Sequence, residues 1–251
     1  MTEERAKGQG PKDKLPRFLD AGEAALVVEF GTAINPAISE QVLALDAFLS
    51  NDPHPGILEL VPTYRSLMVH YDPLAIGRDP LIARIREALL KRKEPANRVS
   101  LWIVPCCYEA EFAEDLGEVS RVTGIPGDRI VALQVEALYR IYMYGFAPGF
   151  TYLGGLPNEI AISRRLTPRP PHEAGAVLIG GGQCAISTFS MPTGWHVIGR
   201  TPERLYAPAR EQPFLLEPGE HVRFEPVDAA TFFALDQRAA TGEIVARRTA
   251  R

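Results

Sequence analysis

The chain has 251 residues, 46% of them hydrophobic and 23% charged, a balance typical of a globular protein with one large domain or two ordinary ones. The net charge of −4 gives no electrostatic reason to expect a nucleic-acid partner, and no apolar run approaches the ~18 residues that a membrane span needs. Three cysteines (Cys106, Cys107 and Cys184) and an N-terminus without an apolar signal region predict free thiols and a cytoplasmic protein.

The first half of the chain predicts alternating strands and helices. Residues 1–17 are polar and are expected to form a disordered arm. Apolar and β-branched runs predict strands at 24–30, 57–61, 67–71 and 99–104. Asn35-Pro36 and Asp79-Pro80 each begin a helix, because Asn and Asp cap a first turn and Pro fits within it. The order βαββαβ predicts a small ferredoxin-like α/β domain over residues 18–98, whose last strand closes it near 98–105.

In the second half of the chain, the spacing of apolar residues, Gly and Pro changes. Short helices are expected near residues 112–122 and 128–138, and from residue 139 onward short apolar runs are separated by Gly and Pro. Strands at such spacing predict a barrel or a sandwich over residues 99–228, and closure into a barrel would remove exposed sheet edges. Residues 229–251 are expected to form a C-terminal helix and a frayed tail. The fold class predicted from these patterns is α+β.

The run Tyr144–Gly155 is the most distinctive segment. It holds four glycines, one proline and four aromatic residues in twelve positions. Glycine permits positive φ and close backbone approach, whereas proline fixes φ near −65°. The run therefore predicts either the rigid aromatic wall of a groove or a tightly packed corner with buried rings.

Each of the other candidate residues has a functional and a structural interpretation. Gly180–Gln183 presents backbone N–H groups to an anion or is a plain turn. Arg169 binds a carboxylate or phosphate or lies on the surface, and Arg200 binds an anion or pairs with a buried Glu. Trp195 is a core ring or a groove wall. Cys106 and Cys107 are expected in the core, and Cys184 is the better thiol candidate.

Two kinds of site have no sequence signal. The phosphate-binding pattern GxxxxGK[ST] has no match. HExxH and CxxC patterns are also absent from the sequence, and the five histidines are scattered. We therefore expect no metal site.

Several motifs together resemble one known family. They are GFAPGFTYL from Gly145, Pro168-Arg169, AGAV from Ala174, Gly182-Gln183, PTGW from Pro192 and IGRTP from Ile198. The chain resembles, over about residues 18–228, the family of B-type subunits of bacterial 5-oxoprolinase, also described as the KipI kinase-inhibitor family and as allophanate hydrolase subunit 1. The resemblance implies a small α/β N-terminal domain followed by a cyclophilin-like β-barrel domain.

The resemblance also implies a function. Family members work with a second carboxyltransferase-like protein (the C-type subunit) and a LamB/YcsF-type protein (the A-type subunit) to hydrolyse 5-oxo-L-proline to L-glutamate with ATP. ATP is the implied cofactor, bound either by this chain or only by the assembled complex. The catalytic residues expected on this chain are Arg169, Gln183 and Arg200. The expected substrate-binding residues are Phe146, Pro148, Phe150, Tyr152, Gly182, Ser187 and Trp195.

Four positions depart from the family pattern. Gln134 stands where the family commonly has His, and Ala176 stands where it often has Gly-Ser-Val after Pro-Ala. Ser187 replaces a Tyr of the family pattern, and Met191 replaces a Ser. These departures keep two further functions open, both from the same resemblance. One is a KipI-like inhibitor of a sensor histidine kinase. The other is an allophanate or urea-related amide hydrolase subunit, or a homologue repurposed to bind a peptide or a urea-derived compound.

Overall fold

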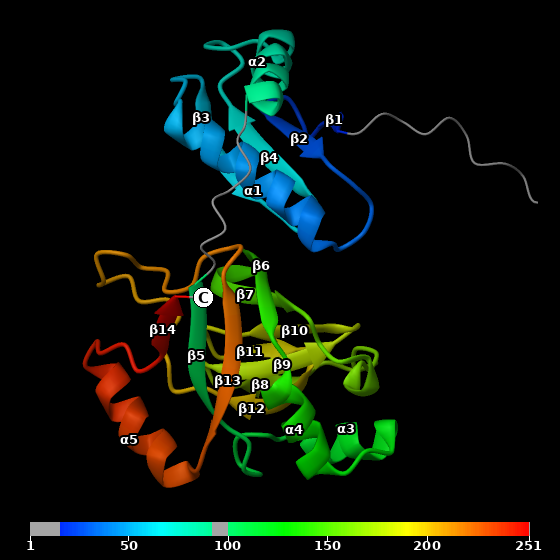
Figure 1. Cartoon of the computed structure of the whole chain (residues 1–251), viewed down its shortest axis with the longest axis vertical. Helices are drawn as coiled ribbons and strands as arrows, with labels where there is room; N and C mark the ends of the chain where they lie inside the picture. Colours follow the sequence, from blue (N-terminus) through cyan, green and yellow to red (C-terminus); the bar gives the residue numbers. More distant parts are fainter. Residues whose placement is uncertain (1–15, 92–99, 251) are drawn as a thin grey trace, which may run out of the picture. The chain divides into compact units, whose positions relative to one another are not determined.

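The structure is a computed structural model that describes residues 16–91 and 100–250. The chain divides into two compact units, Met1–Pro95 and Ala96–Arg251 (Figure 1). The expected disordered arm lies outside the described residues, except for its last two positions. Arg17 already belongs to a strand.

The N-terminal unit is a four-stranded antiparallel sheet with two helices. Its strands, in the order β1-β2-β4-β3, are Arg17–Asp20, Ala25–Glu29, Ser66–Tyr71 and Ile57–Pro62. Helix α1 (Pro36–Asn51) begins where the Asn35 side chain accepts the N–H of Ala37 at 2.8 Å, and α2 spans Arg78–Lys91. Both helices and the sheet bury apolar side chains in one core, which includes Leu26, Leu45, Val69 and Ile85.

One strand of the predicted N-terminal order belongs elsewhere. The run expected to close the ferredoxin-like module is β5 (Ser100–Cys107), which lies in the barrel of the second unit. The fourth strand of the N-terminal sheet is β1, which precedes the module and is held to β2 by the Arg17–Glu29 ion pair. The apolar pattern of residues 99–104 predicted a strand correctly, but such a pattern does not specify the sheet that the strand joins.

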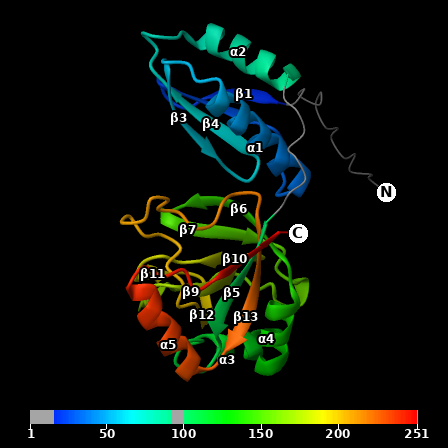
Figure 2. The ribbon, with the colours of Figure 1, turned by 60° about the vertical axis from the view of Figure 1, so that its left-hand side comes forward.

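The second unit confirms the expected barrel. Its strands β6, β7, β9, β10, β12 and β13 are Tyr139–Gly145, Ala147–Gly154, Ala176–Gly180, Gln183–Ile186, His196–Arg200 and His221–Val227. With β5 they form the ring β12-β9-β10-β7-β6-β13-β5, which the pairing of Arg200 with Cys107 closes (Figure 2). Large apolar side chains fill the interior, among them Tyr139, Leu153 and Phe224. The mixed α+β class is therefore confirmed.

Smaller elements surround the barrel. Helices α3 (Leu116–Thr123) and α4 (Gly127–Glu136) lie together at one end, and α5 (Ala229–Ala240) contacts β5 (Figure 1). The short strands β8 (Arg169–His172) and β11 (Met191–Thr193) pair with each other, and a 3₁₀ turn, η1, spans Asn158–Ile160. The expected frayed tail is instead a strand, β14 (Arg247–Ala250), which pairs with β5.

Candidate functional site

Four of the predicted substrate-binding rings form a continuous row, which we call the aromatic strip. Phe146 lies edge-on to Phe150 with ring centroids 5.6 Å apart, and Phe150 lies 5.0 Å from Tyr152. Tyr152 in turn lies 6.2 Å from the ring of Trp195. Three of these rings come from the β6–β7 hairpin and the fourth from the residue before β12. The tertiary structure therefore brings together rings that are 43 to 49 residues apart in the sequence.

The local sequence explains how β7 presents its rings. Side chains alternate across a strand, so Phe150 and Tyr152 share the outer face of the barrel, whereas Leu153 enters the interior core. Under the strip lie Ala185 and other small or apolar side chains of that outer face. Exposure varies along the strip: Phe146 is 78% exposed and Tyr152 is half-buried, whereas Phe150 and Trp195 are buried. The strip is therefore part packed layer and part open surface, which combines the two interpretations of the Tyr144–Gly155 run.

The tip of the hairpin has an uncommon backbone. Phe146 has φ of +69°, a left-handed conformation that few residues with a side chain adopt. Gly149 has φ of +71°, and an added Cβ there would lie 2.6 Å from the Cβ of Tyr206. The carbonyl of Pro148 accepts the hydroxyl of Thr188 at 2.7 Å. The predicted residue Pro148 thus fixes the hairpin that carries the strip.

The side chain of an arginine lies at the other end of the aromatic strip. The exposed Arg164 has its guanidinium carbon 5.1 Å from the centre of the Trp195 ring. Burial raises the pKa of the Tyr152 hydroxyl, and the positive charge of Arg164 opposes that shift. The sequence did not point to Arg164, because nothing in the pair Arg164-Arg165 distinguishes one arginine from the other.

Glycines of the β9–β10 turn adjoin this cation. A Cβ added to Gly181 would lie 3.8 Å from Nε of Arg164, and one added to Gly182 would meet nothing within 4 Å. Both glycines have positive φ, at 61° and 76°. Gln183 begins β10 directly after this turn and pairs with Gly180. Gly182 and Gln183, two of the predicted site residues, therefore lie at the polar end of the strip.

Arg169 lies in an ion-pair cluster rather than in the strip. Its Nη1 donates to Oδ2 of Asp115 at 2.7 Å, and its Nη2 bonds to Glu114. Arg165 donates to Oδ1 of Asp115 at 3.0 Å and also pairs with Glu118. The buried Asp115 thus bridges two arginines, and its Oδ2 also accepts a backbone N–H of β12. Sequence reasoning missed Asp115, whose partners lie 50 to 82 residues further along the chain.

Arg200 lies away from the strip, whereas Ser187 directly follows β10, which pairs with β7. Arg200 ends β12, four residues and about 13 Å along the strand from His196. Its Nε donates to the carbonyl of Ala174 at 2.9 Å, and its guanidinium lies over the ring of Phe232. The hydroxyl of the fully buried Ser187 accepts the N–H of Ala176 at 3.1 Å. These contacts give both side chains structural partners.

The departures from the family pattern lie in different places. Gln134 is fully buried, accepts a hydrogen bond from the hydroxyl of Tyr139 at 2.5 Å, and lies beside the sulfur of Cys184. Burial raises the pKa of the Cys184 thiol to about 12, so this thiol is not a nucleophile at neutral pH. Ala176 is buried beneath the strip, and Met191 packs partly against it. Ala176, Met191 and Ser187, whose hydroxyl bonds to the N–H of Ala176, therefore lie next to the strip, whereas Gln134 does not.

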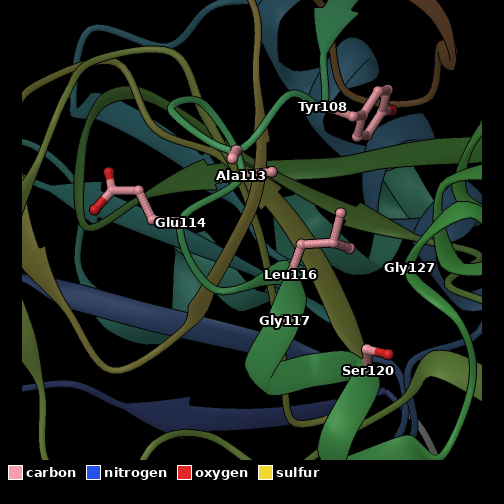
Figure 3. A pocket seen from close by; sticks show the side chains of 8 residues that line it. Tyr108, Ala113, Glu114, Leu116, Gly117, Ser120 and Gly127 are labelled. Atoms are coloured by element: carbon pink, nitrogen blue, oxygen red, sulfur yellow. The ribbon is translucent and has the colours of Figure 1, made fainter.

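Two pockets of the described residues lie apart from the strip. A pocket of about 390 Å³ lies near α3 and α4, lined by Tyr108, Glu114, Leu116, Ser120 and small residues (Figure 3). The carboxylate of Glu114 points away from Tyr108 in this view. A second pocket, of about 500 Å³, lies in the N-terminal unit between α1 and β3. Neither pocket is lined by a predicted site residue.

Two further kinds of feature are absent from the described part of the chain. Residues 16–91 and 100–250 contain no group of three His, Cys, Asp or Glu side chains placed to hold a metal ion. Within the same ranges, no helix has the length and apolarity needed to cross a membrane.

Comparison with known proteins identifies the family. The family described as carboxyltransferase domain, subdomain C and D, matches residues 16–216, and the chain belongs to it. The B-type subunit of 5-oxoprolinase from Bacillus subtilis (strain 168) is 33% identical over 225 residues, which cover 85% of this chain and 93% of that protein. The protein of the same name from Haemophilus influenzae is 35% identical over 190 residues, covering 75% of this chain and 89% of that one.

Solved structures agree with the family assignment. TTHA0988 superposes with a TM-score of 0.73 at 33% identity over 82% of this chain, which spans only 40% of that longer chain. The urea carboxylase of Kluyveromyces lactis gives a TM-score of 0.76 over 93% of this chain and 24% of its own. Its identity of 18% supports the fold alone.

Proposed function

We propose that this chain is a subunit of a 5-oxoprolinase complex, which hydrolyses the cyclic amide 5-oxo-L-proline to L-glutamate with ATP. The observation that carries the proposal is the match to three proteins named as B-type subunits of 5-oxoprolinase, at 33–35% identity and over 89–93% of their lengths. The word subunit in these names implies partners. We propose a carboxyltransferase-like C-type subunit and a LamB/YcsF-type protein as the A-type subunit, in the cytoplasm.

The chemistry of the reaction explains why several subunits are needed. A lactam is a poor electrophile. Transfer of the terminal phosphoryl group of ATP to its oxygen makes the carbonyl carbon of the ring susceptible to attack by water. Such a reaction requires donors for a developing oxyanion and cations for phosphate. Most arginines near the strip are already paired with acidic side chains. We therefore propose that the partner subunits supply the ATP site.

The aromatic strip is the part of this chain that we assign to the substrate. A small ring with one apolar face suits a row of aromatic side chains, and the glycine turn beside Gly182 and Gln183 leaves room for polar groups of the substrate. The catalytic roles of Arg169, Gln183 and Arg200 stay predictions. Of the three, Gln183 lies nearest to the polar end of the strip in sequence and fold.

The deciding experiment is ATP hydrolysis dependent on 5-oxo-L-proline. This chain would be mixed with its two partner subunits, and each of the three would be omitted in turn. We expect turnover only from the full mixture. A well-folded complex without turnover would contradict the proposal, and allophanate and inhibition of a sensor histidine kinase would then be tested with the same material.

A further inference from the structure

Arg164 differs from the arginines that follow it in the chain. Five arginines that follow it each donate to a carboxylate or a backbone carbonyl: Arg165, Arg169, Arg200, Arg204 and Arg210. Arg164 makes no ion pair or hydrogen bond with any residue in the described ranges, and its guanidinium lies instead over the face of Trp195. Its charge is therefore available to a ligand.

The stack on Trp195 holds this free cation in one place. The indole is 7% exposed, and the guanidinium carbon lies 5.1 Å from its ring centre. An aromatic face attracts a guanidinium through its ring quadrupole, which limits the positions that a long exposed side chain would otherwise sample. A guanidinium donates through N–H groups in its own plane, and this geometry matches a carboxylate with two parallel hydrogen bonds.

The surroundings of Arg164 limit the shape of the ligand. Tyr152 and the nearly buried Trp195 lie edge-to-face on one side, so the partly exposed Tyr152 offers the accessible ring surface. Gly180 and Gly181 approach the arginine stem closely enough that a Cβ on Gly180 would lie 3.4 Å from Cγ of Arg164. The glycines keep the space beside the guanidinium clear of side chains. A cation beside an apolar ring surface suits a small molecule with one carboxylate and one flat, weakly polar ring.

We propose that Arg164, held on Trp195, binds the carboxylate of such a ring-bearing substrate while the substrate ring lies against Tyr152. This inference rests on the proposed function for the identity of the substrate, because 5-oxo-L-proline is a five-membered lactam that carries one carboxylate. The inference itself assigns Arg164 to substrate binding. Its role is to position the lactam by its carboxylate, which takes no part in the ring opening.

The test compares two ligands that differ only in the carboxylate, 5-oxo-L-proline and pyrrolidin-2-one. In the reconstituted complex, Arg164→Gln is expected to raise KM for 5-oxo-L-proline about tenfold and to change kcat little, because a charge-assisted bond formed on binding is lost. Arg164→Lys keeps the charge, and its KM for 5-oxo-L-proline is expected to lie between those of wild type and Arg164→Gln. Inhibition by pyrrolidin-2-one should be equal in wild type and Arg164→Gln.

The matched control is Arg121→Gln, which removes an exposed arginine of α3 and should leave KM unchanged. An unchanged KM in Arg164→Gln would overturn the inference while the proposed function stands. Equal weakening of both ligands would also overturn it, because Arg164 would then only shape the strip. A melting temperature equal to that of wild type would show that Arg164→Gln is folded.

A further measurement separates this inference from the proposed function. If the wild-type complex does not turn over 5-oxo-L-proline, the proposed function fails, and both ligands are titrated calorimetrically into the full chain. Tighter binding of the carboxylated ligand, lost in Arg164→Gln, would support the carboxylate site without that reaction. No preference for the carboxylated ligand would overturn the site as well.

Discussion

Asp115 organises the region next to the aromatic strip. One carboxylate accepts hydrogen bonds from Arg165, from Arg169 and from the backbone N–H of Val197, and all three are 2.7–3.0 Å long. The N–H of Asp115 in turn donates to the carbonyl of Val197 at 2.9 Å. This double connection ties the start of α3 to β12, next to Trp195. Asp115 therefore positions the strip without belonging to it.

Asp115→Asn should destabilise the barrel unit by about 2 kcal/mol. The amide keeps the shape of the side chain but removes a charged acceptor of two arginine hydrogen bonds, so that each arginine keeps only its second partner, Glu118 or Glu114. The measurement is the free energy of unfolding in urea. Glu243→Gln is the control, because it breaks a surface pair with Arg238 and should leave the midpoint unchanged. A wild-type midpoint for Asp115→Asn would refute the role given to this carboxylate.

At the scale of elements, β14 closes an edge that the barrel leaves open. It pairs with residues 100–103 of β5, whereas β12 reaches β5 only at Cys107. The buried carboxylate of Glu203 accepts the N–H groups of Val245 and Ala246 at 2.7 Å each, just before the strand. An unpaired stretch of β5 would expose backbone donors and acceptors. The C-terminal residues are thus part of the barrel.

Two neighbouring arginines of β14 allow a matched comparison. Arg248 donates to Oε1 of the buried Glu220 at 2.6 Å and lies over the ring of Trp102, whereas Arg247 pairs with the exposed Glu225. Arg248→Ala should lower the free energy of unfolding by about 1.5 kcal/mol, and Arg247→Ala by at most about 0.5 kcal/mol. Urea unfolding of both variants measures the difference. Equal losses would mean that only the backbone pairing of β14 matters.

At the scale of the whole molecule, the chain carries two separate apolar cores. One lies between α1, α2 and the four-stranded sheet, and the other fills the barrel. The division between residues 95 and 96 therefore separates two units, each of which buries apolar side chains in its own core. The family match over residues 16–216 includes parts of both units.

A fragment of residues 96–251 should fold alone, because its barrel is closed and its core is its own. We expect one cooperative thermal transition and well-dispersed amide resonances that overlay on those of the full chain. A fragment that melts without cooperativity, or whose resonances collapse to the centre of the spectrum, would contradict the independence of the barrel. The full chain, measured under the same conditions, is the reference.

The sequence alone determined the features that depend on local pattern. Most strand and helix segments, the mixed α+β class and the change at residue 139 to the short strands of a barrel or a sandwich follow from apolar periodicity and from the placement of Gly and Pro. Alternation along β7 also fixes that Phe150 and Tyr152 share a face. The motifs around Gly145 and Ile198 carried the family resemblance, which the comparisons confirm.

The tertiary structure alone decided which segments meet. The strand at 100–107 joins a barrel rather than the preceding sheet, and the tail at 247–250 pairs with it, because the partners of a strand lie far away in the sequence. Long-range packing also decides which charged side chains are paired. Arg169 is neutralised by acids 54 and 55 residues away, whereas Arg164 is left free on Trp195. Local pattern sets what each segment can form, and long-range packing sets which side chains remain available for a ligand.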